Sequence, residues 1–97
     1  MASNNTVLDI RKRCRIVTET FDSEIGSYID ACIIDLGRVG ITAISETDAI
    51  ILHLISLYVK AALNFEQDGE RYQRAYEYMR NGISLAGDYN GAVSENV

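Results

Sequence analysis

The chain has 97 residues, of which 47% are apolar, and its 14 acidic and 9 basic side chains give a formal net charge of −5. This length suffices for one domain with a modest core. The acidic balance argues against a protein that grips nucleic acid by neutralising phosphates. Charged residues interrupt every apolar run, which argues against a membrane-spanning segment.

Helical periodicity dominates the chain. Proline is absent, and apolar residues recur at helical spacing in four blocks. Thr6 and Asp9 predict a capping box at the start of a short first helix. Asp22 or Ser23 is expected to cap the second helix, and Gly40 to end it in a left-handed conformation. The apolar stripe of the second helix comprises Ile25, Ile29, Cys32, Ile33, Leu36 and Val39.

The third block begins near Asp48, with Ser45 or Thr47 as its predicted start. It is apolar over most of its circumference, which predicts a central helix covered on several sides. Asp68 and Gly69 predict a turn before a fourth helix over about residues 70–86. The expected inner face of this helix comprises Tyr72, Ala75, Tyr76, Met79, Ile83 and Ala86, and Arg71, Arg74, Glu77 and Arg80 are expected outside.

Together these patterns predict an all-α fold, a small bundle of four helices in a single domain over residues 1–86. Residues 87–97 show no period and little apolar content, so we expect a flexible C-terminal tail. The predicted core is Ile29, Ile33, Leu36, Leu54, Ile55, Tyr58, Tyr76 and Met79.

Residues with catalytic potential are few and scattered. Cys14 and Cys32 lack metal-binding or redox spacing and are expected to be free, buried thiols in a reducing cytoplasm. His53 is the only histidine, so neither a zinc site nor an activated nucleophile is indicated. Asp22-Ser23 resembles the attachment motif of acyl carrier proteins, but an ordinary helix start is favoured. We therefore expect no enzyme, no catalytic residue, no metal and no cofactor.

Charge is divided unevenly along the chain. Residues 1–17 hold four bases and one acid, a net charge of +3, whereas residues 18–97 hold five bases and thirteen acids, a net charge of −8. This asymmetry favours head-to-tail attraction between copies. Arg11, Arg13 and Arg15 are the predicted subunit contacts, and a solvated helix face is the alternative.

Several short motifs follow one another along the second, third and fourth blocks. Tyr28-Ile29-Asp30-Ala31 and Asp35 lie in the second block, Gly40-Ile41 follows, and Leu57-Tyr58-Val59-Lys60 lies in the third. The fourth contains the series Arg71, Tyr76, Met79 and Ile83. Over about residues 6–86 this order resembles the head–tail connector (adaptor) proteins of tailed phages.

The resemblance implies a structural virion protein at the head–tail interface, assembled in the host cytoplasm. Such proteins form a homo-oligomeric ring of about twelve copies under the portal protein. The ring extends the channel, encloses duplex DNA without sequence-specific binding, contacts no membrane and docks a stopper or tail-completion protein.

In such a connector, Tyr89 and Val93 would be the portal contact, since they are the only large apolar side chains before the last residue of the tail. An inert chain end is the alternative for the tail. For the whole chain, the alternative is a small helical adaptor or regulatory protein that binds a single protein partner.

Overall fold

The computed structural model describes residues 3–42, 44–45, 48–64 and 67–87. Every regular element in these ranges is an α helix, which confirms the all-α prediction. The expected tail lies, apart from Gly87, outside the described residues. The helices are α1 (Asn4–Arg13), α2 (Asp22–Arg38), α3 (Ala49–Leu63) and α4 (Gly69–Ala86).

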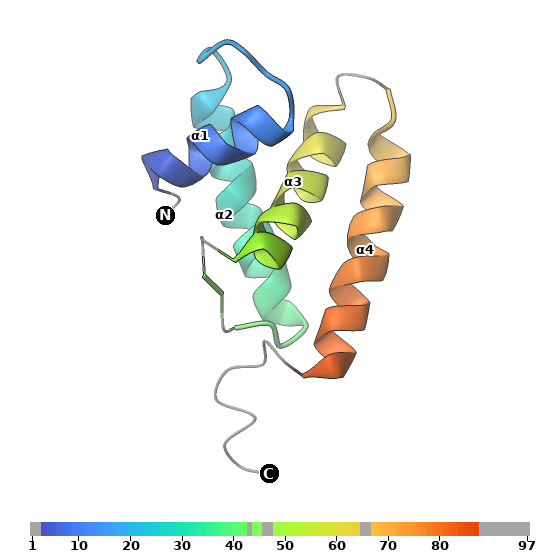
Figure 1. The fold of residues 1–97 in the computed structure, drawn as a ribbon. Coiled ribbons are helices and arrows are strands. Elements are labelled where there is room, and N and C mark those ends of the chain that lie inside the picture. The colour runs from blue at the N-terminus through green and yellow to red at the C-terminus, as the bar shows by residue number, and fades with distance from the viewer. Residues whose placement is uncertain (1–2, 43, 46–47, 65–66, 88–97) are drawn as a thin grey trace.

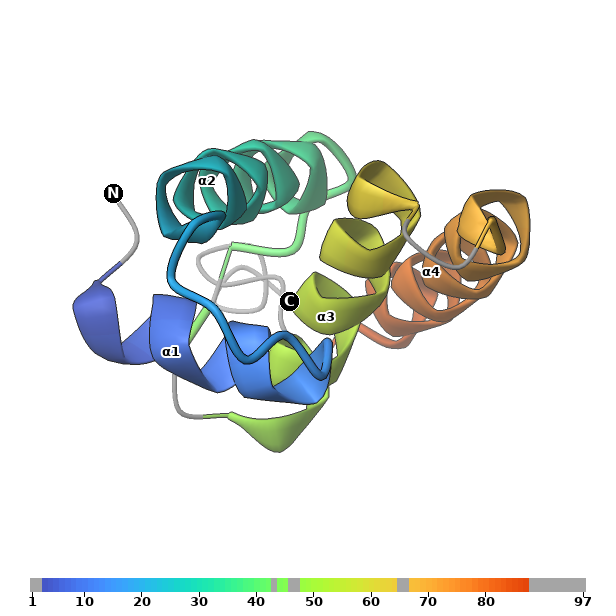
Figure 2. The same ribbon diagram turned by 90° about the horizontal axis from the view of Figure 1, so that it is seen from above.

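Helix α3 is the centre of the bundle, as its apolar circumference predicts. It packs against each of the other three helices, and α1 crosses both α2 and α3 (Figures 1 and 2). Helix α4 lies on the far side of α3 and packs mainly on it. The buried residues of α3 are Ile51, Leu52, Leu54, Ile55, Ser56, Leu57 and Val59.

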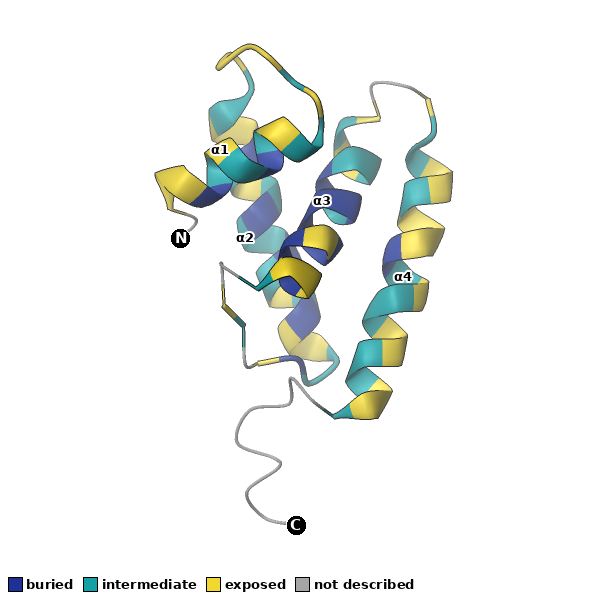
Figure 3. Ribbon diagram, viewed as in Figure 1, coloured by how far each residue is buried: buried dark blue, intermediate teal, exposed yellow. Residues whose placement is uncertain are grey.

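The predicted core is largely confirmed. Five of its eight residues are buried, and Ile33, Tyr58 and Met79 are half-buried against them. On α4, however, Tyr76 is the only buried residue (Figure 3). The expectation that Ala75 and Ala86 belong to the inner face is wrong, because both are exposed. A helix covered by one neighbour buries only a narrow stripe, so the flanks of α4 remain in water.

The first helix begins earlier than its sequence predicts. Ser3, and not Thr6, is the N-cap, and its Oγ accepts a hydrogen bond from the Thr6 backbone N–H at 3.2 Å. The predicted capping box is therefore wrong. Thr6 is buried, and the Asp9 carboxylate instead accepts a hydrogen bond from Arg13 Nε at 2.9 Å.

The expected caps of α2 and α4 also differ. Phe21 precedes α2 without a side-chain cap, while Asp22 lies within the helix. Asp48, and not the predicted Ser45, caps α3, since its Oδ1 accepts hydrogen bonds from the N–H groups of Ile50 and Ile51. Thr47 lies outside the described residues. Asp68 precedes α4 but does not cap it with its side chain.

One asparagine joins the end of α3 to the start of α4. Asn64 ends α3 in the left-handed conformation (φ 52°), and its Oδ1 accepts a hydrogen bond from the Gly69 N–H at 2.8 Å. A Cβ at position 69 would lie 2.7 Å from that oxygen and 3.0 Å from the Ala61 carbonyl oxygen. Glycine is therefore required by close approach. Gly40 follows α2 with a positive φ, as expected, and Gly87 ends α4 in the same conformation.

Candidate interaction surfaces

A polar cluster ties α4 to α2 beside Tyr58 of α3. The Tyr76 hydroxyl donates a hydrogen bond to Asp35 Oδ2 at 2.6 Å, and Arg80 Nη1 donates to the same oxygen at 2.8 Å. The Cys32 thiol donates a long hydrogen bond, 3.7 Å, to the Tyr76 hydroxyl. Nearby, the Ser84 hydroxyl donates to a backbone carbonyl at the end of α2. These bonds compensate for the narrow apolar contact of α4.

The cluster shifts the acidity of its members. Burial alone would raise the pKa of Asp35, but hydrogen bonds from Tyr76 and Arg80, together with the positive charge of Arg80, lower it. Burial raises the pKa of Tyr76, and its hydrogen bond to Asp35 raises it further. The cluster therefore contains a charged carboxylate held by a neutral phenol and a guanidinium.

Three of the connector-like motifs meet at this cluster. Asp35 comes from the second block, Tyr58 from the third and Tyr76 from the fourth. The Tyr58 and Tyr76 rings pack edge to face with centroids 5.2 Å apart. Aromatic pairs prefer this geometry. The resemblance thus has a structural basis, because residues far apart in the sequence together position α4.

The prediction that Arg80 lies on the outside of α4 is wrong. Its side chain is only 18% exposed and pairs with Asp35 within the cluster. Its guanidinium also lies 5.6 Å from the centre of the Tyr76 ring. Its position four residues after Tyr76 places both on the same face, and that spacing is the signal which could have identified it.

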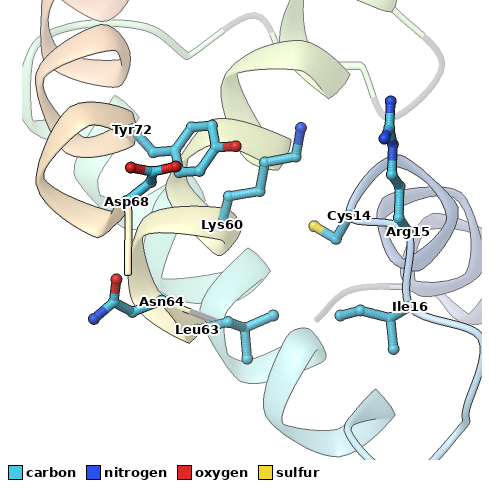
Figure 4. A pocket seen from close by; sticks show the side chains of 8 residues that line it. All are labelled: Cys14, Arg15, Ile16, Lys60, Leu63, Asn64, Asp68 and Tyr72. Atoms are coloured by element: carbon cyan, nitrogen blue, oxygen red, sulfur yellow. The ribbon is translucent and has the colours of Figure 1, made fainter. Parts of the chain in front are cut away.

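A hollow of about 220 Å³ lies where the end of α1, the end of α3 and the start of α4 meet. Leu63 and Ile16 point toward each other across it, and Lys60 lies beside Tyr72 (Figure 4). The Lys60 ammonium is 5.5 Å from the Tyr72 ring centre. The hollow is smaller than typical small-molecule sites, which are about 300–1,000 Å³. It therefore suits a side chain of a partner better than a cofactor.

Cys14 also lines this hollow but is not a reactive thiol. Burial raises the pKa of Cys14 to about 11, although the nearby charge of Lys60 lowers it slightly. Burial likewise raises the pKa of Cys32 to about 12. Both cysteines are free, as expected, with Cys32 buried and Cys14 half-buried. A protonated thiol is a poor nucleophile at neutral pH.

The three arginines predicted at a subunit contact differ in their surroundings. Arg11 Nη1 lies 3.5 Å from Asp22 Oδ1, and the Arg11 side chain is only 12% exposed. Arg13 pairs with Asp9 one turn earlier. Arg15 is exposed, and no ion pair in the described part of the chain includes it. Arg15 therefore offers its charge to a partner most directly.

The remaining candidates give no catalytic arrangement. His53 is exposed, and the buried Ser56 hydroxyl donates to the His53 carbonyl oxygen at 2.7 Å. Within the described ranges, no three His, Cys, Asp or Glu residues are grouped to hold a metal ion. Helices long and apolar enough to cross a membrane are likewise absent from those ranges. Tyr89 and Val93 lie outside the described residues.

Comparison with protein families matches residues 7–90 to the family described as phage connector protein. No curated protein and no solved structure matches the chain. The matched segment includes α2, α3 and α4 and all but the first turn of α1. It therefore contains every member of the polar cluster and both sides of the hollow. The chain belongs to the phage connector family, whose members are structural proteins joining the head and tail of the virion.

Proposed function

We propose that this chain is a head–tail connector that forms a ring of about twelve copies under the portal protein. In this position it extends the DNA channel and docks a stopper or tail-completion protein. The observation that carries the proposal is the family match, which covers nearly the whole described bundle. The convergence of the connector-like motifs on Asp35, Tyr58 and Tyr76 supports it.

The charge distribution is compatible with a channel for DNA. At least five of the nine basic side chains have an acidic partner in the same chain, as the described residues show. Each base that neutralises a phosphate adds affinity for duplex. Basic side chains that are already paired with carboxylates are less available to phosphates, so they favour passage of DNA over tight binding. This agrees with a channel that encloses DNA of any sequence.

Reconstitution tests the proposal. DNA-filled heads that carry a portal but lack a connector are mixed with the purified chain and examined by electron microscopy. We expect a ring of added density below the portal, retained DNA and acquired competence to bind tails. Heads that remain unchanged would contradict the proposal. If the chain instead formed a one-to-one complex with a single other protein, the alternative of a single-partner adaptor would be favoured.

Arg15 is the basic residue that we propose contacts a neighbouring copy. Its φ of 60° places it in the left-handed region after α1, where glycine is less strained. Arg15→Gly should therefore raise the free energy of unfolding by up to about 1 kcal/mol. The same change should weaken ring assembly, because it removes an exposed positive charge. Urea unfolding and sedimentation velocity measure the two effects.

Gln67 provides a matched control for Arg15. It is also exposed and left-handed, with a φ of 59°, but carries no charge. Gln67→Gly should raise stability in the same way and leave assembly unchanged. If Arg15→Gly assembles as well as the wild type, the basic segment does not contribute to the subunit contact.

The tail is proposed to attach the connector to the portal. Removal of residues 88–97 should leave the melting temperature unchanged, because the described core lies entirely before them. Attachment to portal-bearing heads should fail. Tyr89→Ala and Val93→Ala should each weaken attachment, whereas Ser94→Ala, in the same segment, should not. A truncated protein that still joins heads and yields tailed particles would show that the tail is passive.

A further inference from the structure

The side of α4 opposite α3 bears large apolar groups in water. Tyr78 is 84% exposed and Leu85 is 89% exposed. With Ala75 and Gly82 they form a line at alternating spacings of three and four residues, which lies on one face of a helix. We call these four residues the outer stripe of α4. Tyr78 and Leu85 together offer a partner an apolar strip along the outside of α4.

Positive charge adjoins the first half of this stripe. Arg71 and Arg74 lie three or four residues from members of the stripe and are 69% and 71% exposed. Their acidic partners, Asp68 and Glu70, belong to the same turn and are themselves exposed, so these pairs contribute little and are easily exchanged. The outer side of α4 is thus basic toward its start and apolar toward its end.

Helix α2 has a complementary face on its side away from α3. Ile34 is 61% exposed there. Glu24, Ser27, Ala31 and Ile34 form a line with the same alternating spacing as the outer stripe of α4, and we call them the outer stripe of α2. This stripe is acidic at its start and apolar at its end. Its spacing matches Ala75, Tyr78, Gly82 and Leu85 residue for residue.

The directions of the two helices permit this pairing between copies. Within one chain α2 and α4 run in the same direction on different sides of α3 (Figures 1 and 2). A second copy related by rotation about an axis along the helices would therefore present α2 parallel to α4 of the first. Such a contact joins different surfaces of the two copies, and its repetition closes a ring.

We propose that the outer stripe of α4 packs in parallel on the outer stripe of α2 of a second copy. Leu85 then meets Ile34 of the neighbouring copy, the small residues Gly82 and Ala31 allow close approach, and Arg74 faces Glu24. The inference rests on the proposed ring-forming connector and specifies which surfaces join its subunits.

Charge exchange between copies tests the pairing. Arg74→Glu alone and Glu24→Lys alone should each weaken self-association at least about tenfold, because like charges then face each other. An equimolar mixture of the two variants should regain assembly, since every α4 can meet an α2 of opposite charge in an alternating ring. Glu19→Lys makes the same change as Glu24→Lys at an exposed position before α2; it is the control and should assemble normally.

Disulfide trapping tests the apolar half. Ile34→Cys combined with Leu85→Cys should give a ladder of covalent multimers on a non-reducing gel, in solution and in particles complemented with the variant. Either substitution alone should give at most a faint dimer band on the gel. The native thiols should not compete at about pH 8, because burial keeps them protonated.

The outcomes separate this contact from the proposed function. Strong dimers from Leu85→Cys alone would mean that α4 packs on α4, which overturns the pairing. Absence of a ladder, in particles that contain the chain, would overturn the contact and leave the connector role intact. A ladder in solution from a chain that never enters particles would support the contact and contradict the connector role.

Discussion

Leu54→Ala should lower the free energy of unfolding by about 2–5 kcal/mol, the range for truncation of a large side chain in a packed core. Leu54 is completely buried, and it lies in the helix that packs against all three others. The surrounding helices cannot all move to fill the space, so a cavity remains. Urea or guanidinium unfolding followed by circular dichroism measures the change.

Ile50→Ala is the matched control for Leu54→Ala. Ile50 belongs to the same helix but is 43% exposed, so its truncation should cost much less. A loss below about 0.5 kcal/mol for Leu54→Ala, typical of surface substitutions, would show that α3 is not the centre of the core.

Tyr76→Phe should lower the free energy of unfolding by about 1.5–3 kcal/mol, the range for a hydrogen bond to a charged group. The change keeps the ring that packs against Tyr58 but removes the hydroxyl that donates to Asp35. Asp35 would remain paired with Arg80 alone. Tyr78→Phe, on the exposed side of α4, is the control and should have a smaller effect.

The same cluster predicts how stability depends on pH. The pKa of Asp35 in the folded chain lies below its ordinary value of 3.8, so its contribution is present above that value. It is lost as the pH falls through the lowered pKa. The wild type should therefore lose this contribution below about pH 4. Asp35→Asn should flatten this part of the profile, and an unchanged profile would mean that Asp35 is not the responsible group.

The number of helices and the central place of α3 could be predicted because both follow from local periodicity. The apolar residues of α2 and α3 recur so regularly that periodicity alone predicts Ile29, Leu36, Leu54 and Ile55 in the core. The helix starts were less predictable. Ser3, Thr6 and other polar residues compete for the same capping role, and packing of the whole chain decides between them.

The polar cluster could be predicted only in part. Asp35 and Tyr76 were noted as motif residues, but they are 41 positions apart, and periodicity carries no information on bonds across helices. The basic segment was identified from a sum of formal charges. Such a sum cannot show that Arg11 is held by Asp22, which lies in the next helix.

The position of α4 at the edge of the bundle has a consequence for the order in which the protein comes apart. Helices α1, α2 and α3 contact one another, so they retain a shared core if α4 detaches. Helix α4 is held to the bundle mainly by one apolar strip on α3 and by the bonds to Asp35, so loss of those bonds weakens its attachment. Protonation of one carboxylate would loosen the helix that bears the proposed subunit contact. Acid should then release subunits from one another before the subunits themselves unfold.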